Sequence, residues 1–120
     1  MTGAIVIRWG AGVPGREAKG LEVFGEAVTH FEGLSKTGRI HSHREFLALT
    51  GRDGGFMIVE GELAELLKIV AEEATLRLNA KAAAIVQDFE IQCFAGGSGS
   101  AVQGMIGTYT TSLAEIGYLG

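Results

Sequence analysis

The chain has 120 residues, of which 47% are hydrophobic and 20% charged, so it is able to bury the core of one domain. Its net charge of -4 excludes a typical binder of the nucleic-acid backbone, which carries a surplus of lysine and arginine. Cys93 is the single cysteine, so no intramolecular disulfide forms, and the start MTGAIVIRWG lacks the basic residues and cleavage site of a secretory signal. We therefore expect a cytoplasmic protein.

The first half of the chain predicts a strand, a helix and a hairpin. Residues 4 to 9 form a β-branched apolar run typical of an interior strand. Residues 16 to 34 carry apolar side chains at the spacing of one helical face, namely Leu21, Phe24, Val28 and Phe31. Residues 40 to 49 and 56 to 60 predict two further strands, which TGRDGG joins with turn-forming residues.

The second half predicts a helix, a fourth strand and a terminal helix. Residues 62 to about 84 are helical in pattern, with Asn79 as a candidate break and with an apolar stripe of Leu63, Leu66, Leu67 and Val70. Residues 88 to 95 alternate apolar and polar side chains, as a strand does. Residues 101 to 119 form an amphipathic helix, and GGSGS before it interrupts the uncharged segment 91 to 114, so we expect no membrane span.

This order, βαββαβ followed by a helix, is typical of the ferredoxin-like α+β fold, in one domain covering residues 1 to 120. Two helices then cover one face of a four-stranded antiparallel sheet, and the other face stays open. Because the strands are apolar on both sides, we expect a homodimer in which two open faces form a dimeric α/β barrel.

The terminal helix needs a packing partner as well. Gly104, Gly107 and several threonines give it poor intrinsic helicity, so only burial of its apolar stripe can hold it. We expect it to fold over the sheet edge or onto the dimer partner. The stripe consists of Val102, Met105, Ile106, Tyr109, Leu113 and Ile116.

The glycines after the first strand match G-x-G-x-x-G through Gly10, Gly12 and Gly15. A dinucleotide site needs an acidic residue about 20 positions later, at the end of a second parallel strand. Here that distance falls at His30 and Glu32, which are still inside the first helix, and the next strand continues into a hairpin. We therefore interpret the glycines as a turn and expect no nucleotide cofactor.

The segment RIHSHREF raises the question of a metal site. Residues two apart on a strand share a face, so His41, His43 and Glu45 would point the same way, as ligands of a divalent metal do. The alternative is that the histidines form the polar start of an edge strand. Since no further ligand is fixed by another element, we expect no bound metal.

Three other residues deserve comment. Cys93 lies in an apolar strand and is expected to be an inert buried thiol. Arg8 interrupts a central apolar strand, so it needs a carboxylate or the mouth of a cavity. Trp9 is large enough for the core, although its N–H also suits the rim of a pocket.

The strings WGAGVPGREAKGLEVFGEA and NAKAAAIVQDFEI, with GRI before the second strand and GG before the third, resemble an uncharacterised bacterial family of small proteins. That family in turn resembles the dimeric α/β-barrel superfamily. The resemblance implies a ferredoxin-like fold and a homodimer, and it brings no catalytic residues. His43 and Arg44 stand where the family tends to have an aromatic and an acidic residue.

Three functions follow as hypotheses. We favour a small homodimeric protein that binds a small organic ligand in a pocket between sheet and helices, without a cofactor. The candidate ligand-binding residues are Arg8, Trp9, His41, His43 and Gln92. The alternatives are a cofactor-independent monooxygenase- or isomerase-like enzyme, which the fold alone suggests, and a protein-interaction module that docks through its terminal helix.

Overall fold

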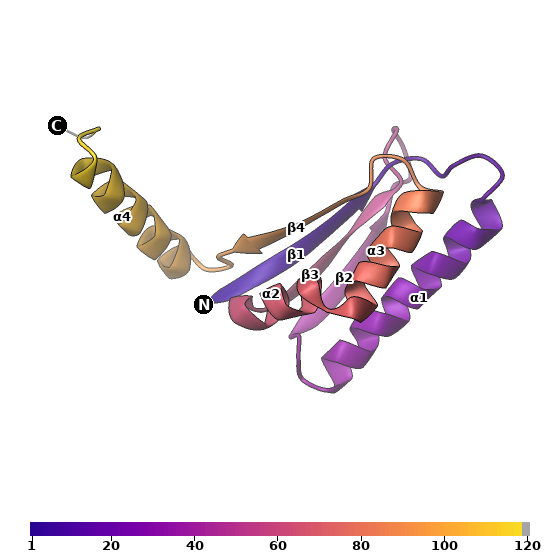
Figure 1. The fold of residues 1–120 in the computed structure, drawn as a ribbon, viewed down its shortest axis with the longest axis horizontal. Coiled ribbons are helices and arrows are strands. Elements are labelled where there is room, and N and C mark those ends of the chain that lie inside the picture. The colour runs from indigo at the N-terminus through magenta and orange to yellow at the C-terminus, as the bar shows by residue number, and fades with distance from the viewer. Residues whose placement is uncertain (119–120) are drawn as a thin grey trace.

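A four-stranded antiparallel sheet organises the computed structural model, which describes residues 1 to 118 (Figure 1). Its strands are β1 (Thr2–Trp9), β2 (Ser42–Leu47), β3 (Gly55–Glu62) and β4 (Glu90–Ala95), in the spatial order β2-β3-β1-β4. The predicted interior position of β1 is confirmed, because it pairs with β3 on one side and β4 on the other. β2 is an edge strand and pairs with β3 alone.

Three helices cover one face of this sheet, as Figure 1 shows. They are α1 (Glu17–Lys36), α2 (Leu63–Ala71) and α3 (Glu73–Ile85). Alternate strand residues face them, so the core joins Ile5, Ile7, Met57 and Val59 of the sheet to Phe31, Leu34, Leu66 and Ile69 of the helices. This arrangement is the predicted ferredoxin-like α+β fold.

The predicted break at Asn79 is wrong, because the second helical segment breaks at Glu72 instead. Glu72 has extended backbone angles, with φ -71° and ψ 147°, and it ends α2 and begins α3. Arg39 binds Glu72 there and also binds Glu65 of α2, at N–O distances of 2.9 and 2.6 Å. The break lets α2 bury Leu66 and Ile69 against the sheet while α3 packs beside α1.

The predicted apolar face of the first helix is also corrected. Leu21 points to solvent with 77% of its surface exposed, whereas Val23 is buried. The buried stripe of α1 therefore begins at Val23 and continues through Phe31 and Leu34. The predicted spacing of three and four residues between apolar side chains is right, but the buried face begins at Val23 and not at Leu21.

The fourth helix, α4 (Gly99–Glu115), extends away from the rest of the molecule (Figure 1). None of its described residues is buried, so it does not fold over the sheet edge of its own chain. The radius of gyration is 17.2 Å, against roughly 14 Å for a compact chain of this length, because α4 stands apart. The predicted end of this helix at residue 119 lies outside the described residues.

Two glycines set the direction in which the chain leaves β4. Gly96 and Gly97 have φ values of 131° and 104°, which side chains rarely tolerate. Thr2 holds this turn in place, since its carbonyl accepts from the Gly96 N–H at 3.0 Å and its Oγ1 donates to the Gly96 carbonyl at 2.5 Å. Ser98 then caps α4 by accepting the N–H of Ala101.

Among the helices of residues 1 to 118, none combines the length and the apolar character that a membrane crossing requires.

Candidate functional site

A cavity of about 80 Å³ lies between the sheet and the pair of helices α1 and α3. The sheet contributes Ile7, Trp9 and Met57 to its wall. Its helical side and its end are lined by Gly20, Val23, Phe24, Ala27, Phe31, Thr75, Leu78, Asn79, Ala82, Ile85, Val86 and Phe89. The wall is thus almost entirely hydrocarbon, which is the usual character of a small-molecule site.

Thr75 and Asn79 are wall residues with polar side chains. They are four residues apart on α3, so they lie one turn apart on the same helical face. Thr75 is 1% exposed, and its Oγ1 lies 3.1 Å from Nε2 of His30 on α1. Partial burial lowers the pKa of His30, the carboxylate of Glu72 raises it and Arg39 lowers it, and the net shift is downward. These surroundings therefore favour the neutral imidazole.

Trp9 is held against the cavity by the close approach of another backbone. A Cβ atom at Gly55 would lie 2.8 Å from Cζ2 of the Trp9 ring, and one at Gly54 would lie 2.5 Å from Cδ1. Only glycine leaves room there for the indole. On its other side the ring meets Phe24 with a centroid distance of 5.8 Å.

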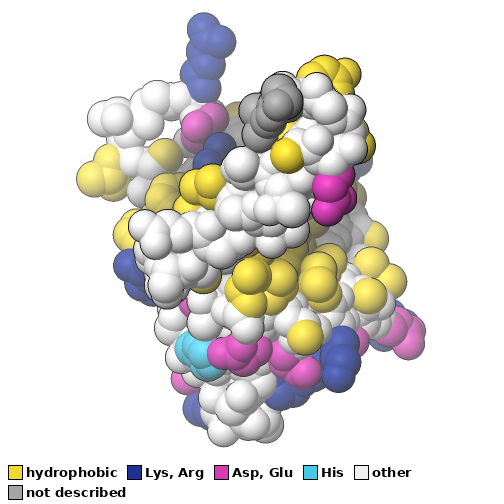
Figure 2. Space-filling model, turned by 90° about the vertical axis from the view of Figure 1, so that its left-hand side faces the viewer, with side chains coloured by type: hydrophobic (Ala, Val, Ile, Leu, Met, Phe, Trp, Pro, Cys, Tyr) yellow, Lys and Arg dark blue, Asp and Glu magenta, His cyan; other side chains and the backbone are white. Residues whose placement is uncertain are grey.

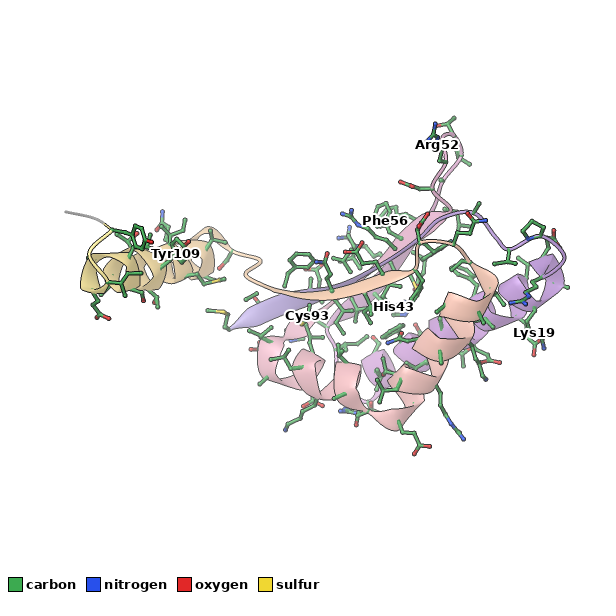
Figure 3. All side chains as sticks on the ribbon, turned by 45° about the horizontal axis from the view of Figure 1, so that its top comes forward. Lys19, His43, Arg52, Phe56, Cys93 and Tyr109 are labelled. Atoms are coloured by element: carbon green, nitrogen blue, oxygen red, sulfur yellow. The ribbon has the colours of Figure 1, made fainter. Side chains whose placement is uncertain are left out.

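His43 lies on the helix side of β2 (Figure 3), opposite Val59 of β3, and is not among the residues that line the cavity. Its Nδ1 is 2.5 Å from Glu45 Oε1, and its Nε2 is 2.6 Å from Glu32 Oε2 of α1. Partial burial lowers the pKa of His43, but the hydrogen bonds from these two carboxylates outweigh that effect and raise it. The hydrogen bond between His43 and Glu32 also lowers the pKa of the Glu32 carboxyl. This cluster ties the edge strand to α1.

His41 does not join that cluster. It precedes β2, is exposed, and has its Nε2 3.9 Å from Glu62. The prediction that alternate residues of RIHSHREF share one face is therefore right for His43 and Glu45. His41 precedes β2 and lies near Glu62 instead. Within residues 1 to 118, no group of three histidine, cysteine or acidic side chains is placed to hold a metal ion.

Arg8 and Gln92 lie on the open face of the sheet, where they flank Val6 on β1 and β4. The aromatic rings of Phe46 and Phe56 stack on the same face at 4.8 Å. Figure 3 shows Phe56 on the side of the sheet opposite the helices. Arg8 also borders a broad hollow of about 700 Å³ beneath the β2–β3 hairpin. Its other charged lining residues are Arg52, Asp53, Asp88 and Glu90.

The structure brings two of the five predicted ligand-binding residues together, because Arg8 and Trp9 both border the hollow at the β2–β3 hairpin, and it does not gather all five in one place. Trp9 lines the cavity, Arg8 and Gln92 are on the open face, His43 is in the ionic cluster and His41 is at the surface. Sequence reasoning missed Thr75 and Asn79, although their four-residue spacing was a usable signal, because they are the only uncharged polar residues of α3.

The glycine-rich loop after β1 has a structural role. The loop after β1 is hydrogen-bonded to the α3–β4 connection, with Gly10 N–H donating to Gln87 O at 2.7 Å and Gln87 N–H donating to Ala11 O at 2.8 Å. This explains its glycines as a turn that closes the end of the fold.

Burial raises the pKa of the Cys93 thiol, so this half-buried side chain stays protonated.

Comparison with solved structures shows what this fold is similar to. A dimeric protein of unknown function and ferredoxin-like fold from Bacteroides fragilis matches 79% of this chain and 96% of its own, with a TM-score of 0.59 and 12% identity. SnoaB, a cofactor-independent oxygenase from Streptomyces nogalater, matches 81% of this chain and 93% of its own, with a TM-score of 0.56 and 14% identity. The predicted ferredoxin-like fold is thereby confirmed.

The sequence matches no protein-family model and no curated protein.

Proposed function

We propose that this protein is a homodimer that binds a small organic molecule in the cavity between the sheet and helices α1 and α3. The observation that supports this proposal is the cavity itself, an apolar space of about 80 Å³ that has two residues with polar side chains, Thr75 and Asn79, in its α3 wall. Apolar cavities in proteins exclude water and take apolar guests, because few polar partners for water are present. Trp9 is the predicted ligand-binding residue that would contact this guest.

Dimerisation would occur through the open face of the sheet. Ala4, Val6, Ile58, Phe56 and Phe46 form an apolar strip there, with Phe46 and Phe56 both exposed in the single chain. Removal of such a strip from water favours association, because the hydrophobic effect is the dominant favourable contribution to most protein–protein contacts. The dimeric state of the Bacteroides fragilis neighbour supports this part of the proposal. Arg8 and Gln92 would then face the partner subunit.

A thermal-shift screen tests ligand binding. Small aromatic and aliphatic compounds should raise the melting temperature, since a ligand that binds only the folded state stabilises it. Ala82→Phe fills the cavity from α3 and should abolish the shift, while Ala80→Phe adds the same ring at an exposed position of that helix and should preserve it. A shift that persists in Ala82→Phe would place the ligand elsewhere.

A second candidate is cofactor-independent oxygenation, the activity for which SnoaB is named. The His30 imidazole, whose pKa is lowered chiefly by partial burial, would act as a base through the Thr75 hydroxyl, which it contacts at 3.1 Å behind the cavity wall. Oxygen uptake with hydroquinone as the probe, in the absence of added cofactor, tests this candidate. Uptake at the rate of hydroquinone alone would leave ligand binding as the better description.

A further inference from the structure

Thr75 is the polar anchor of the cavity. Its side chain is almost fully buried, and it is the only polar residue among residues 1 to 118 that falls in the buried core. Every buried side-chain N or O atom in that range has a hydrogen-bond partner, which for Thr75 is His30 at 3.1 Å. A hydroxyl that is already bonded on one side still has capacity on the other.

His30 connects this anchor with the outside of the molecule. It also lines a groove of about 490 Å³ between α1 and α3, on the solvent side of Thr75. Glu26, Arg77 and Lys81 border the same groove, and the ion pair of Lys81 with Glu26 at 3.0 Å joins the two helices. His30 therefore projects from α1 and contacts Thr75 from the groove, on the side away from the cavity.

We propose that Thr75 is a specificity-determining residue that selects a small, uncharged ligand with a hydroxyl group, and that His30 orients the Thr75 hydroxyl for it. The ligand would bind with its ring or chain against the apolar wall and its hydroxyl on Thr75 Oγ1. This inference rests on the proposed function of the cavity. Its volume of about 80 Å³ is smaller than the roughly 150 Å³ of a closed cavity that takes benzene, so the ligand has at most one small ring.

The hydroxyl class follows from the two tautomers of a neutral histidine. If His30 Nε2 accepts the Thr75 proton, the lone pairs of Oγ1 face the cavity and the ligand must donate. If Nε2 carries the proton and donates it, the Thr75 hydroxyl is free to donate to the ligand. A ligand hydroxyl satisfies both cases because it donates and accepts, whereas an ether or a ketone satisfies only the second.

A charged ligand does not fit the same wall. The other residues of the cavity wall, including Ile7, Phe31 and Met57, are uncharged and offer no counter-ion. Moving an unpaired charge into such surroundings costs far more than one hydrogen bond returns. The chemical class is thus a neutral alcohol or phenol.

Phenol and toluene test the inference, because they differ mainly in hydroxyl against methyl. Their dissociation constants can be measured on the full chain labelled with ¹³C-methyl methionine, since Met57 lines the cavity whereas Met1 and Met105 do not. From wild type to Thr75→Val, the ratio of the toluene constant to the phenol constant should fall about fivefold, the size of one neutral hydrogen bond. Thr110→Val makes the same change on exposed α4 and should leave the ratio unchanged.

The outcomes separate this inference from the proposed function. If both probes shift the Met57 resonance but the ratio is the same in Thr75→Val, the cavity binds ligands and the role of Thr75 is wrong. If neither probe shifts Met57, both proposals are wrong. Thr75→Ala is a second hydroxyl-free variant if the valine fails to fold, and Thr75→Ser should retain the wild-type ratio.

Discussion

At the scale of single residues, Gly55 and Trp9 depend on one another. Gly55 brings β3 so close that the indole of Trp9 fits beside the backbone, and the indole in turn forms part of the cavity wall. A methyl group at position 55 would meet the Trp9 ring and the Phe46 carbonyl together. The shape of the cavity therefore depends on a residue that has no side chain.

Gly55→Ala should lower the free energy of unfolding by about 1 to 3 kcal/mol, because the crowded backbone and ring cannot both yield. Gly25→Ala is the matched control. It lies in α1 with open space around its Cα, and it should raise the free energy of unfolding by about 0.5 to 1 kcal/mol through helix propensity. Urea unfolding measures both changes, and equal stabilities for the two variants would contradict this account of Trp9.

His43 should make stability depend on pH. Its folded pKa is raised by Glu32 and Glu45, so its contribution is fully present below the unfolded value of about 6.5 and is lost as the pH rises through the folded pKa. The melting-temperature difference between wild type and His43→Gln should therefore be larger near pH 6 than near pH 8.5. His30 and His41 are present in both proteins, so their titrations cancel. A difference that is independent of pH would refute the assignment.

At the scale of elements, α4 is the helix that buries none of its residues against the rest of residues 1 to 118. Its exposed apolar residues include Val102, Met105, Ile106 and Tyr109, and it carries no charge before Glu115. Figure 2, which faces the α4 end, shows yellow hydrophobic side chains on this helix and on the body beneath it. An isolated helix of this length and composition is marginal in water, so we expect it to pack on the second subunit.

A charge on the apolar stripe of α4 should weaken the dimer. Ile106→Glu places a carboxylate at the centre of the stripe, whereas Thr111→Glu places one on the opposite side of the helix. The dimer dissociation constant should rise at least tenfold for the first variant and stay within about twofold for the second. Removal of the residues after Ser100 should have the same effect as Ile106→Glu and expose apolar surface to dye. A truncated chain that dimerises as before would favour docking of α4 to another protein.

The sequence predicts the elements better than it predicts the site. The spacing of apolar residues and the residues that form turns are local properties of the sequence. The order of strands and helices along the chain and the hairpin were therefore predictable from them. The break at Glu72 was not, because it coincides with ion pairs of Arg39, which is 33 residues distant and binds Glu72 at the break and Glu65 before it. A pocket between sheet and helices was predicted, but most of its lining was not, because Thr75 becomes a wall residue only when α3 packs beside α1.

At the scale of the whole molecule, the sheet has two different faces. One is covered by α1, α2 and α3 and encloses the cavity, and the other presents Phe46, Phe56 and Ile58 with no cover from residues 1 to 118. Pairing of two open faces would bury those rings and leave each cavity on the outer side of the dimer, with its helices facing solvent. Ligand access and dimerisation are then independent.

Sedimentation equilibrium at micromolar concentration tests this account of the molecule most directly. We expect a species of twice the 12.6 kDa chain mass, and we expect Ile58→Glu, at the centre of the open face, to sediment as a folded monomer. A wild-type protein that sediments as a single 12.6 kDa species would contradict the homodimer and the barrel together.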